Sequence, residues 1–277
     1  MTKERIEMTP KNHIVFVSLI IAATCLFEMS LLAGLEAVAD PAYQVAHLFS
    51  MGLLIAGQAF LIRHCRQNGL PVTIPALTAA ALVCTGIGDL VNGTLTGITP
   101  VSTKLTFALF LFGTGYLMYN YNLWHAIRTT GDPSRKMPLA ALIPLVVIIL
   151  INNLASWFIY IDELVQGFTL LHYGGLAFNA TIYVAMPVLG VYYAYKTGWA
   201  ISGWIILIAG VFLPYSDLIL FDSWLPGNPD QPVRELYAYN WMVYFNGQCL
   251  MSMLPAFLML ADRKEAPRGS DLNNGLI

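Results

Sequence analysis

The chain alternates between long apolar stretches and short polar segments over almost its whole length. An α-helix needs about 20 apolar residues to cross the roughly 30 Å hydrocarbon core of a bilayer. Eight stretches reach that length: residues 13–37, 42–63, 71–95, 103–127, 138–160, 168–195, 199–221 and 236–261. Backbone groups in lipid must be satisfied within the segment, so such stretches are predicted to be helices rather than barrel strands. The expected fold is all-α, a polytopic bundle of eight transmembrane helices.

Composition agrees with this pattern. The chain has 277 residues, of which 57% are hydrophobic and 11% charged, and its mean hydropathy is +0.64. Ordinary globular domains are about 25% charged, so the sequence indicates an integral membrane protein. One transmembrane domain is expected over residues 1–263, followed by a polar, disordered cytoplasmic tail over 264–277. No basic stripe suggests nucleic acid, and the bilayer is an expected partner; an oligomer or a larger membrane complex stays open.

The basic residues predict the orientation. With eight spans, twelve fall on one side and two on the other, Lys104 and Arg234. Positive residues accumulate on the cytoplasmic side of membrane proteins, so both termini are expected in the cytoplasm. The first stretch is too long for a signal peptide. We expect a multi-pass protein of a bacterial inner (plasma) membrane.

Three carboxylates interrupt the apolar stretches at nearly one depth: Glu28, Asp89 and Asp217. At about 1.5 Å of rise per residue, all three should lie roughly 5 to 10 Å inside the outer edge of the hydrocarbon. An ionisable residue in a membrane span is costly, which makes it a functional-site hypothesis by default. Asp89 and Asp217 each follow small residues that let helices approach, and no Lys or Arg lies at their depth. These two are the predicted catalytic pair, whereas Glu28 could equally cap a hydrogen-bond network.

Other polar side chains are expected near the same layer. Taken singly, the amides fit interhelical hydrogen bonds, and His47 and His172 fit structural hydrogen bonding better than ligation. Tyr116 and Tyr119 should lie somewhat deeper. The amides of this layer are Asn152, Asn153, Asn179 and Gln248, and Ser156 and Tyr244 accompany them.

Paired carboxylates suit acid–base chemistry. Two close carboxylates in a medium of low dielectric constant cannot both ionise easily, which leaves one protonated acid beside one carboxylate. A histidine-rich zinc site needs about three protein ligands, and only His47 and His172 face the outer half. No HExxH spacing, GxSxG elbow or phosphate loop occurs. The four cysteines show no paired spacing. We therefore expect neither a metal nor a cofactor.

Several short motifs follow one another along the predicted spans: Gly88-Asp89, Gly113-Thr114-Gly115-Tyr116, Tyr183 to Met186, Ser216-Asp217, and Tyr244-Phe245-Asn246-Gly247-Gln248. In their order and placement on the spans, these motifs resemble the lysoplasmalogenase (YhhN-like) family over about residues 70–260. The family's early Lys-Pro is not evident here, and its His after Gly-Asp is replaced, so the chain resembles a divergent member. The resemblance implies a lipid or lysolipid as the substrate partner.

The resemblance implies an eight-helix membrane hydrolase that cleaves the vinyl ether bond of a lysoplasmalogen and releases a fatty aldehyde. A neutral carboxylic acid would protonate carbon, and its partner carboxylate would stabilise the oxocarbenium ion and activate water, as paired carboxylates do in glycosidases. Asp89 and Asp217 would share these roles in an order left open. The expected substrate-contacting residues are Glu28, Tyr116, Tyr119, Asn152, Tyr183, Tyr244 and Gln248.

Two other interpretations stay open. Gly86-Ile87-Gly88-Asp89 matches the GxGD of intramembrane aspartyl proteases, but in those proteases the Tyr-Asp helix comes first, and here Tyr215-Ser216-Asp217 comes later. The chain could instead be a non-catalytic transporter, lipid-binding protein or accessory subunit, since transport also uses intramembrane acids. Against transport, the sequence shows no inverted repeat.

Overall fold

The structure is a computed structural model that describes residues 8–33, 40–91, 101–130, 134–165, 169–224 and 234–265. Within these ranges it is helical, with turns between helices and no strand. The helices are α1 (Pro10–Leu32), α2 (Asp40–Gln67), α3 (Thr73–Asp89), α4 (Val101–Thr129), α5 (Leu139–Ser156), α6 (Asp162–Val165), α7 (Thr169–Phe178), α8 (Val184–Lys196), α9 (Ile201–Trp224), α10 (Arg234–Ser252) and α11 (Leu254–Glu265), with π-helical turns η2 (Trp157–Ile161) and η3 (Asn179–Tyr183).

Each of the eight predicted apolar stretches coincides with one helical passage. Turn η2 joins α5 to α6, η3 joins α7 to α8, and a single turn residue, Met253, separates α10 from α11. The boundaries differ slightly from the prediction. Helix α1 ends at Leu32, five residues before the predicted end at 37, and α11 continues through Glu265, past the predicted domain end at 263. Residues 266–277, most of the predicted tail, lie outside the described part of the chain.

Six helical segments are long and apolar enough to cross a membrane, and Thr73–Asp89 is a shorter apolar helix. The all-helical character is therefore confirmed for the described residues, and six of their helical segments are consistent with a multi-pass membrane protein. The six segments are Pro10–Leu32, Gln44–Gln67, Leu139–Ile159, His172–Lys196, Ile201–Ile219 and Ala238–Ala261.

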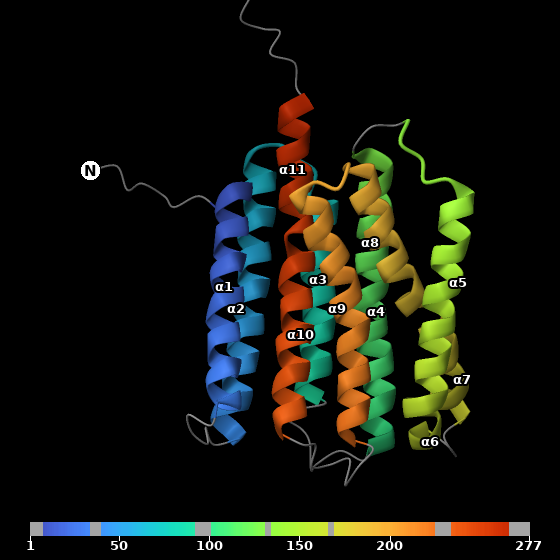
Figure 1. The fold of residues 1–277 in the computed structure, drawn as a ribbon. Helices are drawn as coiled ribbons and strands as arrows, with labels where there is room; N and C mark the ends of the chain where they lie inside the picture. The colour runs from blue at the N-terminus through green and yellow to red at the C-terminus, as the bar shows by residue number, and fades with distance from the viewer. Residues whose placement is uncertain are drawn as a thin grey trace, which may run out of the picture.

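The passages run alternately up and down the bundle (Figure 1), and the beginning of α1 and the end of α11 lie at the same end. Helices α1 and α2 form one edge, α5 to α7 form the other, and α3, α4, α9 and α10 lie between them. The most extensive packing joins α9 to α10, α3 to α4, and α8 to α9. The central helices therefore pack against each other directly and define the interior of the bundle.

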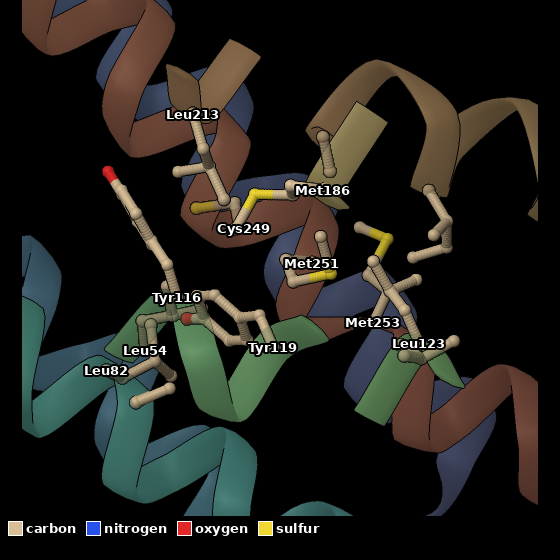
Figure 2. Close-up of a cluster of buried hydrophobic side chains, with 14 of the residues drawn as sticks. Leu54, Leu82, Tyr116, Tyr119, Leu123, Met186, Leu213, Cys249, Met251 and Met253 are labelled. Carbon is tan, nitrogen blue, oxygen red and sulfur yellow. The ribbon is translucent and has the colours of Figure 1, made fainter. Parts of the chain in front are cut away.

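The interior is filled by large side chains from these central helices. Figure 2 shows Tyr116 and Tyr119 of α4 among sulfur-containing side chains such as Met186 and Met251, with Leu213 nearby. All five are essentially inaccessible to solvent. In contrast, α5 exposes apolar side chains along much of its length, as expected for a helix that faces lipid.

Candidate functional site

Asp89 lies at the end of α3, where two glycines let neighbouring helices approach closely. A Cβ at Gly88 would lie 2.7 Å from Cε2 of Phe112 on α4, and one at Gly86 would lie 3.0 Å from Cγ of Met51 on α2. Both contacts are shorter than the roughly 3.5–4.0 Å of carbon atoms in van der Waals contact. The small residues before the carboxylate therefore serve close packing, as the sequence predicted.

Asp217 lies on α9 directly after Ser216, a fully buried residue whose hydroxyl donates to the Leu213 carbonyl at 2.7 Å. On the neighbouring helix α10, Gly247 leaves room for Leu213, since a Cβ there would lie 2.9 Å from Leu213 Cγ. The Tyr183 hydroxyl donates a hydrogen bond to Asp217 Oδ2. Asp217 is thereby held by a phenol from the passage that precedes α9 in the chain.

The two aspartates come together although 128 residues separate them. They lie close enough for their charges to interact, and Tyr244 of α10 adjoins Asp89. Tyr116 lies near both carboxylates and near Tyr183 and Tyr244. Five candidates predicted from the sequence therefore meet in one place, contributed by α3, α4, η3, α9 and α10.

Two polar atoms of this cluster are buried and have no hydrogen-bond partner among the described residues. They are Asp89 Oδ2 and the Tyr116 hydroxyl. Buried polar groups are normally paired, so each exception needs a reason. Two such atoms beside two carboxylates indicate a site built to receive polar groups of a bound molecule or water, rather than one that holds helices together.

Aromatic rings form a continuous wall around the carboxylates. Ring centroids lie 5.7 Å apart for Phe112 and Tyr244, 5.6 Å for Tyr116 and Tyr183, and 5.2 Å for Phe178 and Tyr183. These spacings are typical of favourable edge-to-face and tilted aromatic pairs. The wall makes the surroundings of the carboxylates rigid and apolar. Sequence reasoning missed Phe112 and Phe178, because an aromatic residue in an apolar helix carries no sign of which face it lies on.

Tyr119 and Gln248 form a second polar pair beside this cluster. The Tyr119 hydroxyl donates to Gln248 Oε1 at 2.6 Å, and both side chains are fully buried. The amide nitrogen of Gln248 has no partner among the described residues. Since Gln248 follows Tyr244 by one helical turn on α10, the two lie on the same face of that helix. The pair is therefore placed to extend the site, and its predicted contact with a substrate stays a prediction.

Glu28 has a partner of its own on a neighbouring helix. Its Oε1 lies 2.8 Å from Nε2 of His47, and the residues are 0% and 5% exposed. The His47 ring stacks on Trp241 at a centroid distance of 3.7 Å. The pair ties α1 to α2 and packs against α10. Glu28 therefore belongs to a structural network, the alternative that the sequence left open for it.

Asn152, a predicted substrate contact, is not brought to the site, because its side chain is exposed on α5. Its neighbour Asn153 faces inward instead, and its carbonyl accepts a hydrogen bond from Asn179 Nδ2 at 2.9 Å. Adjacent residues on a helix point about 100° apart, so only one of the two can face the bundle interior.

The described residues form no cluster that could bind a metal, and comparisons with known proteins give no match. Within the described residues, no three His, Cys, Asp or Glu side chains are grouped so that they could hold a metal ion. The four cysteines are free thiols. No protein-family model, curated protein or solved structure matches this chain. The geometry of the site is thus the basis for any functional assignment.

Proposed function

We propose that this protein is a membrane-embedded hydrolase that cleaves the vinyl ether bond of a lysolipid, using Asp89 and Asp217 as an acid–base pair. The observation that carries the proposal is the convergence of two carboxylates inside an aromatic wall, one bonded to a tyrosine and the other with a buried, unpartnered oxygen. A structural pair of acids would need a basic partner or a full set of hydrogen-bond donors.

The two aspartates are assigned different roles. The Tyr183 hydroxyl donates to Asp217, and such a donor stabilises a carboxylate; Asp217 is therefore the anionic partner. Asp89 is assigned as the proton donor, because its Oδ2 is buried and has no hydrogen-bond partner among the described residues. This division supplies a general acid and a stabilising carboxylate for one reacting group.

The reaction starts when protonated Asp89 transfers its proton to the second carbon of the enol ether. The double bond supplies the electron pair, and an oxocarbenium ion forms at the first carbon beside the Asp217 carboxylate. Water then adds to that carbon and passes a proton to Asp217. The resulting hemiacetal collapses: its hydroxyl proton goes to Asp89, the carbon–oxygen bond breaks, and Asp217 protonates the departing alkoxide. The products are a fatty aldehyde and a glycerophospho-alcohol, and both aspartates return to their starting states.

The membrane arrangement of this proposal has eight crossings, with both termini in the cytoplasm. Beyond the six segments long enough to span, α3 and α4 would complete the count. Twelve of the fourteen Lys and Arg residues then lie on the cytoplasmic side. The aspartate pair would lie in the outer half of the bilayer, where an alkenyl chain can enter from lipid. A bacterial plasma membrane fits this arrangement.

The decisive experiment measures aldehyde release by the purified protein from a 1-alkenyl lysophospholipid. In D₂O, the aldehyde should carry one deuterium on its second carbon, because the first step protonates that carbon. The saturated 1-alkyl analogue should be inert. Asp89→Asn and Asp217→Asn should each lower kcat by roughly 10²- to 10⁴-fold, the usual contribution of general acid–base catalysis.

Asp162→Asn is the matched control, because Asp162 lies on α6 beside His172, 3.3 Å away, and outside the aspartate pair. It should retain wild-type activity. If folded wild-type protein releases no aldehyde from choline or ethanolamine substrates of several chain lengths, the hydrolase proposal fails. Ion-coupled flux in proteoliposomes that depends on the same aspartates would then favour a transporter.

A further inference from the structure

The helical passage that carries Tyr183 widens into a π turn immediately before this tyrosine reaches Asp217. Turn η3 covers Asn179–Tyr183, between α7 and α8. In a π turn each N–H bonds to the carbonyl five residues back instead of four. One extra residue per turn rotates the following side chains by about 100° relative to an unbroken α-helix. The register of η3 therefore decides whether Tyr183 faces Asp217.

Pro187 cannot donate a backbone hydrogen bond to this turn, because proline has no N–H. An amide at position 187 would bond to the Tyr183 carbonyl in α register, or to the Ile182 carbonyl in π register. Pro187 lies inside α8 and has no N–H, and a proline ring also crowds the carbonyl four residues back. The backbone at the end of η3 thus needs support from outside its own helix.

That support comes from Asn120 of α4. Its Nδ2 donates to the Ile182 carbonyl at 3.1 Å. Asn120 lies one helical turn beyond Tyr116, whose ring packs against Tyr183. At the other end of η3, Asn179 Nδ2 bonds to the Asn153 carbonyl of α5 at 2.9 Å. Side-chain amides therefore tie both ends of the π turn to neighbouring helices.

We propose that Asn120 is a positioning residue, whose amide holds η3 in the register that presents the Tyr183 hydroxyl to Asp217. The contact that selects the register is the bond to the Ile182 carbonyl, next to the Tyr183 carbonyl that Pro187 leaves without its α-helical donor. The structural part of this inference stands on these contacts alone. Its catalytic consequence rests on the proposed hydrolase function.

The first test reads the environment of residue 183 without using activity. 3-Fluorotyrosine is placed at position 183 and observed by ¹⁹F NMR in detergent micelles. The Asp217→Asn variant gives the reference position: its resonance reports the residue 183 ring when the hydroxyl no longer bonds to a carboxylate. Asn120→Leu removes the amide donor and keeps the same branched arrangement of heavy atoms, and the residue 183 resonance in this variant should move toward that of Asp217→Asn.

A neighbouring asparagine provides the matched control. Asn122 lies two residues along α4, is fully buried, and donates to Thr78 Oγ1 of α3 at 3.0 Å. Asn122→Leu also removes a buried interhelical amide bond, but one that α4 makes to α3 instead of η3. It should lower thermal stability to a similar degree and leave the residue 183 resonance in place.

The second test compares kinetics. Asn120→Leu should lower kcat by about 100-fold with little change in KM, because a misplacement of about 1 Å in a catalytic group has that effect. Asn120→Gln, which keeps the amide, should recover part of the loss. Should Asn120→Leu not fold, Asn120→Ala replaces it.

The outcomes separate the two proposals. A residue 183 resonance that stays unchanged in Asn120→Leu overturns the positioning role, whatever the activity does. The same applies if Asn122→Leu moves the resonance equally, or if neither Asn120 variant folds while Asn122→Leu does. If the resonance moves as expected but wild-type protein releases no aldehyde, the positioning role stands and the hydrolase proposal fails.

Discussion

Substitution of Gly115 by alanine should damage both the stability of the bundle and its candidate site. Gly115 lies on α4 where that helix packs against α3. A Cβ at this position would lie 2.7 Å from the Thr85 methyl carbon and 3.1 Å from the Ala81 carbonyl oxygen. Carbon atoms need about 3.5 Å, so the helices would have to separate by about 0.8 Å at this point.

Thr85 cannot easily move aside to relieve this contact. Its hydroxyl donates to the Ala81 carbonyl at 3.0 Å, so rotation of the side chain would break that bond. The residue is fully buried, and the nearby carbonyl belongs to the backbone of α3. Insertion of a methyl group into such a packed interface typically costs about 1–3 kcal/mol. We expect a loss of that size in the free energy of unfolding.

The same separation should disturb the site, because Gly115 precedes Tyr116, and Thr85 lies one turn before Asp89. A displacement approaching 1 Å should reduce aldehyde release by up to about 100-fold. Stability is measured by SDS titration in mixed micelles followed by circular dichroism, with kinetics measured on the same preparation.

Gly52→Ala serves as the control, because a Cβ at this position of α2 would meet nothing within 4 Å. It should match or slightly exceed wild-type stability, as expected for alanine replacing glycine in a helix. Wild-type stability in Gly115→Ala would refute the close α3–α4 contact on which this reasoning depends.

Two further substitutions test the polar contacts. Tyr183→Phe keeps the ring and removes the hydrogen bond to Asp217; it should lower kcat by at least about tenfold while lowering stability by only about 1 kcal/mol, the typical net value of one hydrogen bond. Steady-state kinetics beside thermal unfolding checks this, and unchanged kcat would exclude a role for that hydroxyl. His47→Ala removes a partner of the buried Glu28 carboxylate and should cost about 3 kcal/mol in SDS unfolding. Glu28→Gln with His47→Ala should recover much of that loss, and a double variant as unstable as the sum of the singles would argue against the pairing.

Much of the architecture could be predicted from the sequence, because the factors that make each apolar stretch helical are local to that stretch. In lipid, the backbone groups of a segment must bond within it, and this requirement does not depend on neighbours. The predicted depth of the carboxylates was equally local, since it depends only on residue count and helical rise. For this reason Asp89, Asp217 and Tyr244 could be assigned to one layer, with Tyr116 somewhat deeper, before any helix was placed. Tyr183 was named from the motifs of the family resemblance.

The rotation of each helix about its axis was beyond the reach of the sequence. A helix that is apolar all round has no amphipathic stripe to show which face turns inward. Asn152 and Asn153 were therefore equivalent as candidates, and only packing directs Asn153 inward. Glu28 was expected at the level of the two aspartates, and the packing of α1 against α2 pairs it with His47.

The sequence alone determined that the chain forms long apolar helices and predicted similar depths for its buried acidic residues. Helix length, backbone bonding and depth are properties of single segments. The tertiary structure decided which polar groups meet: Tyr183 with Asp217, Tyr119 with Gln248, and Asn120 with the π turn. These contacts join segments far apart in the chain. They depend on glycine contacts and helix rotation, which exist only once the bundle is packed.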